Sequence, residues 1–206
     1  NNGIQTSWAK LNKALGGVRP GEVTSITADT GSGKTTWILN IITQLVSKGI
    51  GCLVASTEMS PKKLMTKIFS IYSGKSIYDK EDFTDEVISK CCAFFGMKPL
   101  YIVPVHGQLL ISKIEEIVDY VVRTNDVKVV VLDHLHFFLD IKRSEDERTL
   151  IDAFMKKIVI LAKRYSIHIF LIAHPSKFTS DKGVVSMNSF KGSSSIKQDS
   201  DNVILI

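Results

Sequence analysis

The stretch "EVTSITADTGSGKTT", residues 22–36, joins an apolar run to a glycine-containing loop and to the start of a helical segment that reaches residue 48. In a phosphate-binding loop, the backbone N–H groups surround phosphate oxygens at the N-terminus of the following helix. Such loops end in a lysine followed by a hydroxyl residue, and Lys34 and Thr35 occupy these places. The stretch therefore predicts a nucleotide-binding loop between a strand and a helix.

The residues of this loop have distinct predicted roles. The N–H groups of the loop face the phosphates, the Lys34 ammonium meets the terminal phosphates, and the Thr35 hydroxyl binds Mg²⁺. Ala28 stands where the usual pattern has glycine, and an extended backbone at the end of a strand accepts alanine there. The predicted nucleotide-binding set is Thr30, Gly31, Ser32, Gly33, Lys34, Thr35 and Thr36.

Continuous apolar runs recur along the chain with helical segments between them. The runs cover residues 22–28, 51–57, 100–105, 128–133, 167–173 and 202–206. Strands that are apolar on both faces suit a parallel sheet covered by helices. The pattern predicts an α/β fold with a mainly parallel central sheet flanked by helices on both faces, including helices at 60–73 and 144–165 that begin at Ser60 and Ser144.

Composition limits the class of protein. A chain of 206 residues that is 44% hydrophobic and 23% charged suits one compact domain. The net charge of +5 permits a polyanionic partner without proving one. The three cysteines form neither an even disulfide framework nor a CxxC metal pattern, so we expect thiols in a reducing compartment. No apolar stretch approaches the roughly 20 residues of a membrane-spanning helix, so we expect a soluble protein.

Polar residues at other strand ends complete a candidate site. Asp133 ends the run "KVVVLD", where a carboxylate can orient Mg²⁺-bound water. Glu58 follows the second run and is the candidate general base, with a helix-start glutamate as the alternative. His174 follows the fifth run and is a candidate sensor of the γ-phosphate. His134 and His136 are interpreted as structural, because no cysteine or carboxylate cluster offers metal-ligand spacing with them.

With these pieces in order, the chain resembles the RecA-like P-loop motor domain of ring-shaped replicative DNA helicases. The similarity covers nearly all of the sequence through the blocks at 11–36, 56–60, 129–138, 147–152, 171–177 and 189–206. Histidine at position 174 favours the Twinkle and phage primase-helicase branch, with the DnaB branch more distant. The resemblance implies an NTP-driven helicase that forms hexamers, binds ATP or another NTP with Mg²⁺ between subunits, and moves along single-stranded DNA to unwind a forked duplex.

The resemblance also implies roles for individual residues. Lys34, Glu58, His174 and Gln198 are the catalytic and sensing set, Thr35 and Asp133 hold Mg²⁺, and Gln198 couples the phosphate state to the DNA loops. We expect these groups to converge along one rim of the sheet around the triphosphate. The DNA-facing loops fall at 136–146, 175–191 and 192–199, and their basic candidates are Lys142, Arg143, Lys177, Lys182, Lys191 and Lys197. Such loops bind backbone phosphates without sequence preference.

The sequence also departs from the family pattern at its ends. Residue 1 is Asn and the last run ends at residue 206, so we expect a fragment that comprises one RecA-like domain. The linker helix, any primase-like domain and the family's C-terminal arginine finger would lie outside it, so the fragment would bind nucleotide well and hydrolyse it weakly. Primase and polymerase are implied partners of the whole protein.

Two other functions remain open from the sequence alone. A RecA- or KaiC-type switch would bind DNA and NTP, form a filament or scaffold, and unwind nothing. A small-molecule kinase would suit the phosphate loop but would leave "FKGSSSIKQDSDN" and His174 unexplained. The implied compartment is an organellar matrix (mitochondrion or plastid) or a phage or bacterial cytoplasm.

Overall fold

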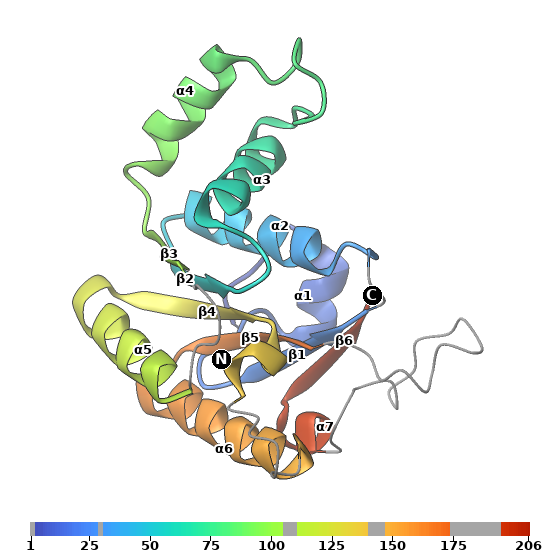
Figure 1. The fold of residues 1–206 in the computed structure, drawn as a ribbon, viewed down its shortest axis with the longest axis vertical. Coiled ribbons are helices and arrows are strands. Elements are labelled where there is room, and N and C mark those ends of the chain that lie inside the picture. Colours follow the sequence, from blue (N-terminus) through green and yellow to red (C-terminus); the bar gives the residue numbers. More distant parts are fainter. Residues whose placement is uncertain (1–2, 29–30, 105–110, 140–146, 174–194) are drawn as a thin grey trace.

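A computed structural model of the chain describes residues 3–28, 31–104, 111–139, 147–173 and 195–206. Its centre is a six-stranded sheet in the order β3-β2-β4-β5-β1-β6 (Figure 1). Every neighbouring pair of strands is parallel. The strands are β1 Val23–Thr27, β2 Gly51–Ser56, β3 Leu100–Pro104, β4 Val127–Asp133, β5 His168–Ala173 and β6 Asn202–Leu205. The predicted α/β fold is confirmed, with a strand in each of the apolar runs.

Helices cover both faces of this sheet. They are α1 Ala9–Leu15, α2 Lys34–Ser47, α3 Pro61–Ser73, α4 Asp85–Phe95, α5 Ile111–Asn125, α6 Glu147–Tyr165 and α7 Ser195–Asp199, with a 3-10 turn η1 Leu135–Phe138. One core joins the sheet to α5 and α6, and a second core joins the opposite face to α2 and α3. The strands β1, β2 and β5 are buried along their whole length, which explains their continuous apolar runs.

Local signals in the sequence account for the helix starts. The Ser60 hydroxyl accepts a hydrogen bond from the Lys63 N–H, and Pro61 occupies the first turn of α3, as predicted. In α6, Phe154, Ile158 and Leu161 are buried as one stripe. The predicted start of this helix at Ser144 lies outside the described residues.

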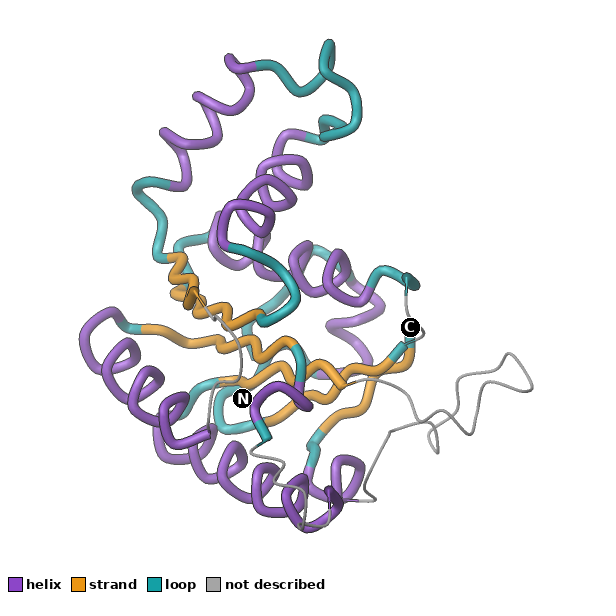
Figure 2. Tube along the Cα trace, viewed as in Figure 1, coloured by secondary structure: helices purple, strands orange, loops and turns teal. Residues whose placement is uncertain are grey.

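The strands lie side by side in one sheet (Figure 2), and because they are parallel their carboxyl ends meet at one edge of it. Ser56 at the end of β2 is paired with Asp133 at the end of β4. Asp133 is paired in turn with Ile172 of β5, and Ala173 is paired with Thr27 of β1. Open parallel sheets bind ligands at this edge, where the strand order changes direction.

Two helices extend from the body of the domain beyond the β2–β3 side of the sheet, and we call α3 and α4 together the arm (Figure 1). Aromatic rings hold the arm together, since Tyr72 stacks on Phe94 at 4.4 Å between ring centroids and Phe69 stacks on Phe95 at 5.7 Å. Among the cysteines, Cys52 and Cys91 are buried and Cys92 is exposed. None of the described helices is both long and apolar enough to cross a membrane.

Candidate nucleotide-binding site

The loop between β1 and α2 has the backbone that phosphate binding requires. Gly31 and Gly33 have φ values of 83° and 95°, in the left-handed region that favours glycine. Gly33 is the N-cap of α2, so the N–H groups of the first helical turn open onto this loop. The helix dipole adds a positive potential at the same place, which makes the loop suited to an anion.

Lys34 is held in place at the start of α2. Its side chain is buried, and its Nζ donates a hydrogen bond of 2.6 Å to the carbonyl oxygen of Ala28. Ala28 is itself fully buried and is not among the described non-glycine residues with positive φ. Alanine is therefore compatible with the backbone at this position, as predicted, and its carbonyl holds the ammonium group beside the loop.

Asp133 connects the loop to the centre of the sheet. Its Oδ2 accepts hydrogen bonds from Thr35 Oγ1 at 3.3 Å and from Ser56 Oγ at 3.1 Å. The residue is only 2% exposed. Burial, together with repulsion from the Glu58 carboxylate, raises the pKa of Asp133 to about 6, against the lowering effects of Ser56, Thr35 and Lys34.

The second oxygen of Asp133 is suited to a cation. Oδ1 is buried and has no hydrogen-bond partner in the described part of the chain. A buried carboxylate oxygen without a partner is costly, and a bound cation or its water would satisfy it. The Thr35 hydroxyl reaches the other oxygen of the same carboxylate, so the two predicted Mg²⁺ residues form one oxygen-rich site beside the loop.

Glu58 lies directly after β2 at the same edge. Its side chain is 37% exposed, and its Oε1 is 3.2 Å from Nε2 of His134, which is buried. The sequence indicated a structural role for His134, and the structure adds a contact with the candidate base. Neither this contact nor the Ser56 hydroxyl has a local signal in the sequence, because both depend on β2 and β4 being neighbours in the sheet.

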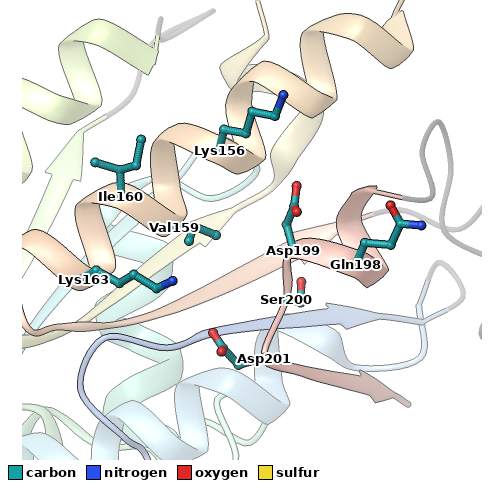
Figure 3. A pocket seen from close by; sticks show the side chains of 8 residues that line it. All are labelled: Lys156, Val159, Ile160, Lys163, Gln198, Asp199, Ser200 and Asp201. Carbon is teal, nitrogen blue, oxygen red and sulfur yellow. The ribbon is translucent and has the colours of Figure 1, made fainter.

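The remaining predicted residues are placed as follows. Gln198 and Lys197 lie on α7, and Gln198 is exposed beside a cavity of about 470 Å³ that Lys156 and Lys163 of α6 also line (Figure 3). The expectation that Gln198 converges with Lys34, Glu58 and Asp133 is wrong, because α7 leads into the start of β6, which is parallel to β1 and so begins at the opposite edge of the sheet. Those outside the described residues are Thr30, Lys142, Arg143, His174, Lys177, Lys182 and Lys191.

A parallel sheet, a glycine loop at a helix N-terminus, a fixed lysine and a buried carboxylate together define a RecA-like P-loop nucleotide-binding domain. The family described as DnaB-like helicase C terminal domain matches residues 3–206. The chain belongs to this family.

Curated relatives agree with this membership. The replicative DNA helicase DnaB of Helicobacter pylori (strain ATCC 700392 / 26695) is 22% identical over 99% of this chain and 43% of its own length. The DNA helicase/primase of Enterobacteria phage T3 is 23% identical over 95% of this chain and 37% of its own length. The chain therefore spans less than half of the length of these curated relatives.

Solved structures share the fold. One solved ATPase domain has a TM-score of 0.84 at 16% identity, over 98% of this chain and 75% of that chain. A second solved structure is that of a DnaB-like replicative helicase, determined in a study of its interactions with primase. It has a TM-score of 0.83 at 16% identity, over 98% of this chain and 52% of that chain. The predicted resemblance to replicative helicases is confirmed, whereas the finer placement in the Twinkle and phage branch stays a prediction.

Proposed function

We propose that this chain is the NTP-driven motor domain of a replicative DNA helicase. The observation that carries the proposal is the meeting of Lys34, Thr35, Glu58 and Asp133 at one edge of the sheet of a DnaB-like domain. The names of the bacterial and phage relatives support a helicase rather than a metabolite kinase.

Nucleotide binding would begin at the loop. The N–H groups at the start of α2 would hold the β- and γ-phosphates, and the Lys34 ammonium would exchange the Ala28 carbonyl for phosphate oxygens. Thr36 lies two residues further along α2, where its exposed side chain is available to the α-phosphate side of the ligand. This exchange of partners keeps the buried lysine satisfied in both states, because one acceptor replaces another.

Thr35 and Asp133 would hold Mg²⁺, which neutralises charge on the β- and γ-phosphates when it is bound. The Asp133 carboxylate must then be ionised, and a nearby cation lowers its pKa from the raised value of about 6. Ser56 keeps one carboxylate oxygen in place, which leaves Oδ1 available to the cation.

Hydrolysis would use Glu58 as the general base. Its carboxylate accepts a proton from a water molecule as the water oxygen bonds to the γ-phosphorus. The bond between the γ-phosphorus and the β–γ bridging oxygen breaks, so that the products are inorganic phosphate and a nucleoside diphosphate. His174 would sense the γ-phosphate, and Gln198, which lies on α7 outside the cluster of the nucleotide loop, would serve the DNA loops.

Single-stranded DNA and a hexameric ring complete the proposal. The basic candidates of the loops are Lys142, Arg143, Lys177, Lys182, Lys191 and Lys197, which would contact backbone phosphates in the central channel. Binding of this kind weakens steeply with salt, since cations are released from the DNA backbone. Primase and polymerase are proposed partners of the protein as encoded, and a forked duplex is its proposed substrate.

Strand displacement by the protein as encoded tests this function. We expect NTP hydrolysis that single-stranded DNA stimulates, together with unwinding of a forked duplex that requires Mg²⁺ and NTP. Lys34→Ala should abolish both activities, and Lys48→Ala, at the end of the same helix, should preserve them. Hydrolysis without unwinding would favour a RecA- or KaiC-type switch, and phosphate transfer to a metabolite without DNA would favour a kinase.

A further inference from the structure

Hydrogen bonds hold the segment that carries Glu58 on both sides of the glutamate, to Asp133 at the end of β4 before it and to Ser56 at the end of β2 after it. Before it, the Thr57 N–H donates to the Asp133 carbonyl oxygen at 2.8 Å, and Ser56 Oγ donates to Asp133 Oδ2 at 3.1 Å. After it, the Met59 N–H donates to the same Ser56 Oγ at 3.3 Å. The backbone around Glu58 is therefore fixed relative to Asp133.

The side chain of Glu58 needs a separate restraint. Its carboxylate is close enough to Asp133 to raise the pKa of that residue, so the two negative charges repel each other. The Glu58 side chain is also 37% exposed, which lets its torsions turn the carboxylate toward solvent. With no restraint, repulsion and entropy would both move the candidate base away from the metal side of the site.

His134 supplies such a restraint from the residue next to Asp133. Its side chain is 6% exposed, and its Nε2 lies 3.2 Å from Glu58 Oε1, within the reach of a hydrogen bond. Packing restricts the imidazole, since the His136 ring lies 5.9 Å away between centroids and η1 follows directly. A buried ring is a fixed point of attachment for a mobile carboxylate.

We propose that His134 is a positioning residue that holds the Glu58 carboxylate beside Asp133, in the place from which it accepts a proton from water. The inference rests on the proposed function, because it assigns a use to the same site. His134 takes no proton from water in this account. Its Nε2 faces one oxygen of Glu58 at 3.2 Å and leaves the other oxygen for the water.

Two substitutions of His134 test this role, because one keeps a hydrogen-bond donor without the ring and the other keeps a ring without the donor. In the protein as encoded, His134→Gln keeps an amide donor near the Nε2 position, whereas His134→Phe keeps a ring without a donor. With ATP, Mg²⁺ and single-stranded DNA, we expect His134→Phe to lower kcat by about 10- to 100-fold, as removal of an orienting partner commonly does. His134→Gln should keep kcat within about fivefold of the wild type, and KM should change little in either variant.

Two further variants keep the test decisive. If the His134→Phe protein does not fold, His134→Asn replaces it, because its shorter amide falls near the Nδ1 position and should lose kcat where His134→Gln does not. His168→Gln is the matched control, since His168 is also buried but contacts Arg19 O and Thr24 Oγ1 instead. It should lower thermal stability and leave kcat unchanged.

A double-mutant cycle with Glu58→Gln provides the strongest test. If His134 acts through Glu58, the double variant should hydrolyse ATP at the same residual rate as Glu58→Gln alone. The inference would be overturned if His134→Phe kept the wild-type kcat. It would also be overturned if His134→Phe lowered kcat by the same factor in the wild type and in Glu58→Gln. The proposed function would stand in either case. A wild-type protein that hydrolyses no nucleotide would overturn both.

Discussion

Asp133 combines a proposed role in Mg²⁺ binding with a cost to folding. The carboxyl group is buried beside a second carboxylate, and its two hydroxyl partners compensate only in part. The folded state therefore binds a proton more tightly than the unfolded chain does, with a pKa of about 6 against the usual 3.8. As pH rises through this interval, ionisation of Asp133 removes stability from the folded protein.

Asp133→Asn should therefore stabilise the nucleotide-free protein at pH 7.5 by about 1–3 kcal/mol, the order of magnitude of a shift of about two pKa units. The amide oxygen can still accept from Ser56 and Thr35. Urea unfolding checks the gain, and differential scanning fluorimetry with Mg²⁺ and ATP should show that the ligand-induced rise in Tm is lost. A less stable Asp133→Asn protein would contradict the origin of the raised pKa.

His168 gives a pH dependence of the opposite kind. Burial lowers its pKa, and its neutral ring contacts Arg19 O at 2.8 Å and Thr24 Oγ1 at 3.0 Å, with Glu22 and Asp201 nearby. The unfolded chain thus takes up a proton that the folded state resists. The stabilising contribution of the neutral ring is fully present above the unfolded pKa of about 6.5 and is lost as pH falls toward the lower folded pKa.

His168→Gln should therefore lower the free energy of unfolding at pH 7.5 by about 1–2 kcal/mol. Its loss of stability between about pH 6.5 and pH 5 should be smaller than that of the wild type. Urea titrations at several pH values in this range give the free energy of unfolding of the wild type and of His168→Gln. Subtracting the two curves removes the contribution of the carboxylates, which both proteins share. Parallel pH curves would show that the His168 pKa is the same in the folded and unfolded chains, contrary to its burial between β1 and β4.

At the scale of the element, the start of α2 combines a requirement of the fold with a proposed role in nucleotide binding. Gly33 has φ 95° and Gly49, just past the far end of α2, has φ 82°. A Cβ added at either position would meet no described heavy atom within 4 Å. The cost of alanine at both places is therefore conformational, about 1–2 kcal/mol for a side chain in the left-handed region.

Gly33→Ala and Gly49→Ala should consequently lose similar amounts of stability in urea unfolding. Only Gly33→Ala should also lose nucleotide binding, because the strained N-cap shifts the N–H groups that face the phosphates. Equilibrium binding of a fluorescent ATP analogue separates the two effects. Equal loss of binding in both variants would mean that α2 as a whole, rather than its first turn, governs the site.

The helices and strands could be predicted from the sequence better than the contacts between side chains. The strands follow from apolar runs, and the nucleotide loop follows from the local order of glycine, lysine and threonine, so neighbours along the chain suffice for both. The contact between His134 and Glu58 joins residues that are far apart in sequence and depends on β2 lying beside β4. Periodicity does not encode strand order, so this contact could not be predicted.

At the scale of the molecule, the described residues form one sheet with a separate core on each face, and the arm extends away from the sheet (Figure 1). Ring contacts join Phe69 and Tyr72 of α3 to Phe94 and Phe95 of α4, and Phe69 and Phe95 also belong to the core on the α2 face of the sheet. Tyr72 is nevertheless 42% exposed, and the contacts of α3 with the body are mainly those with α2. We therefore expect the arm to be less stable locally than the central strands.

We expect the arm to open while the sheet stays intact. Amide deuterium uptake should be faster in 85–95 than in 127–133 and 168–173, and mild denaturant should accelerate it less steeply, as expected for subglobal opening. Phe95→Ala should increase the difference in uptake between 85–95 and the two strands without changing uptake in β5. Equal uptake in all three segments would show that the arm unfolds only together with the sheet. Only two residues separate Glu58 from α3, but the hydrogen bonds from Thr57 and Ser56 to Asp133 lie on the sheet side of that junction, so we expect the proposed site to stay assembled while the arm opens.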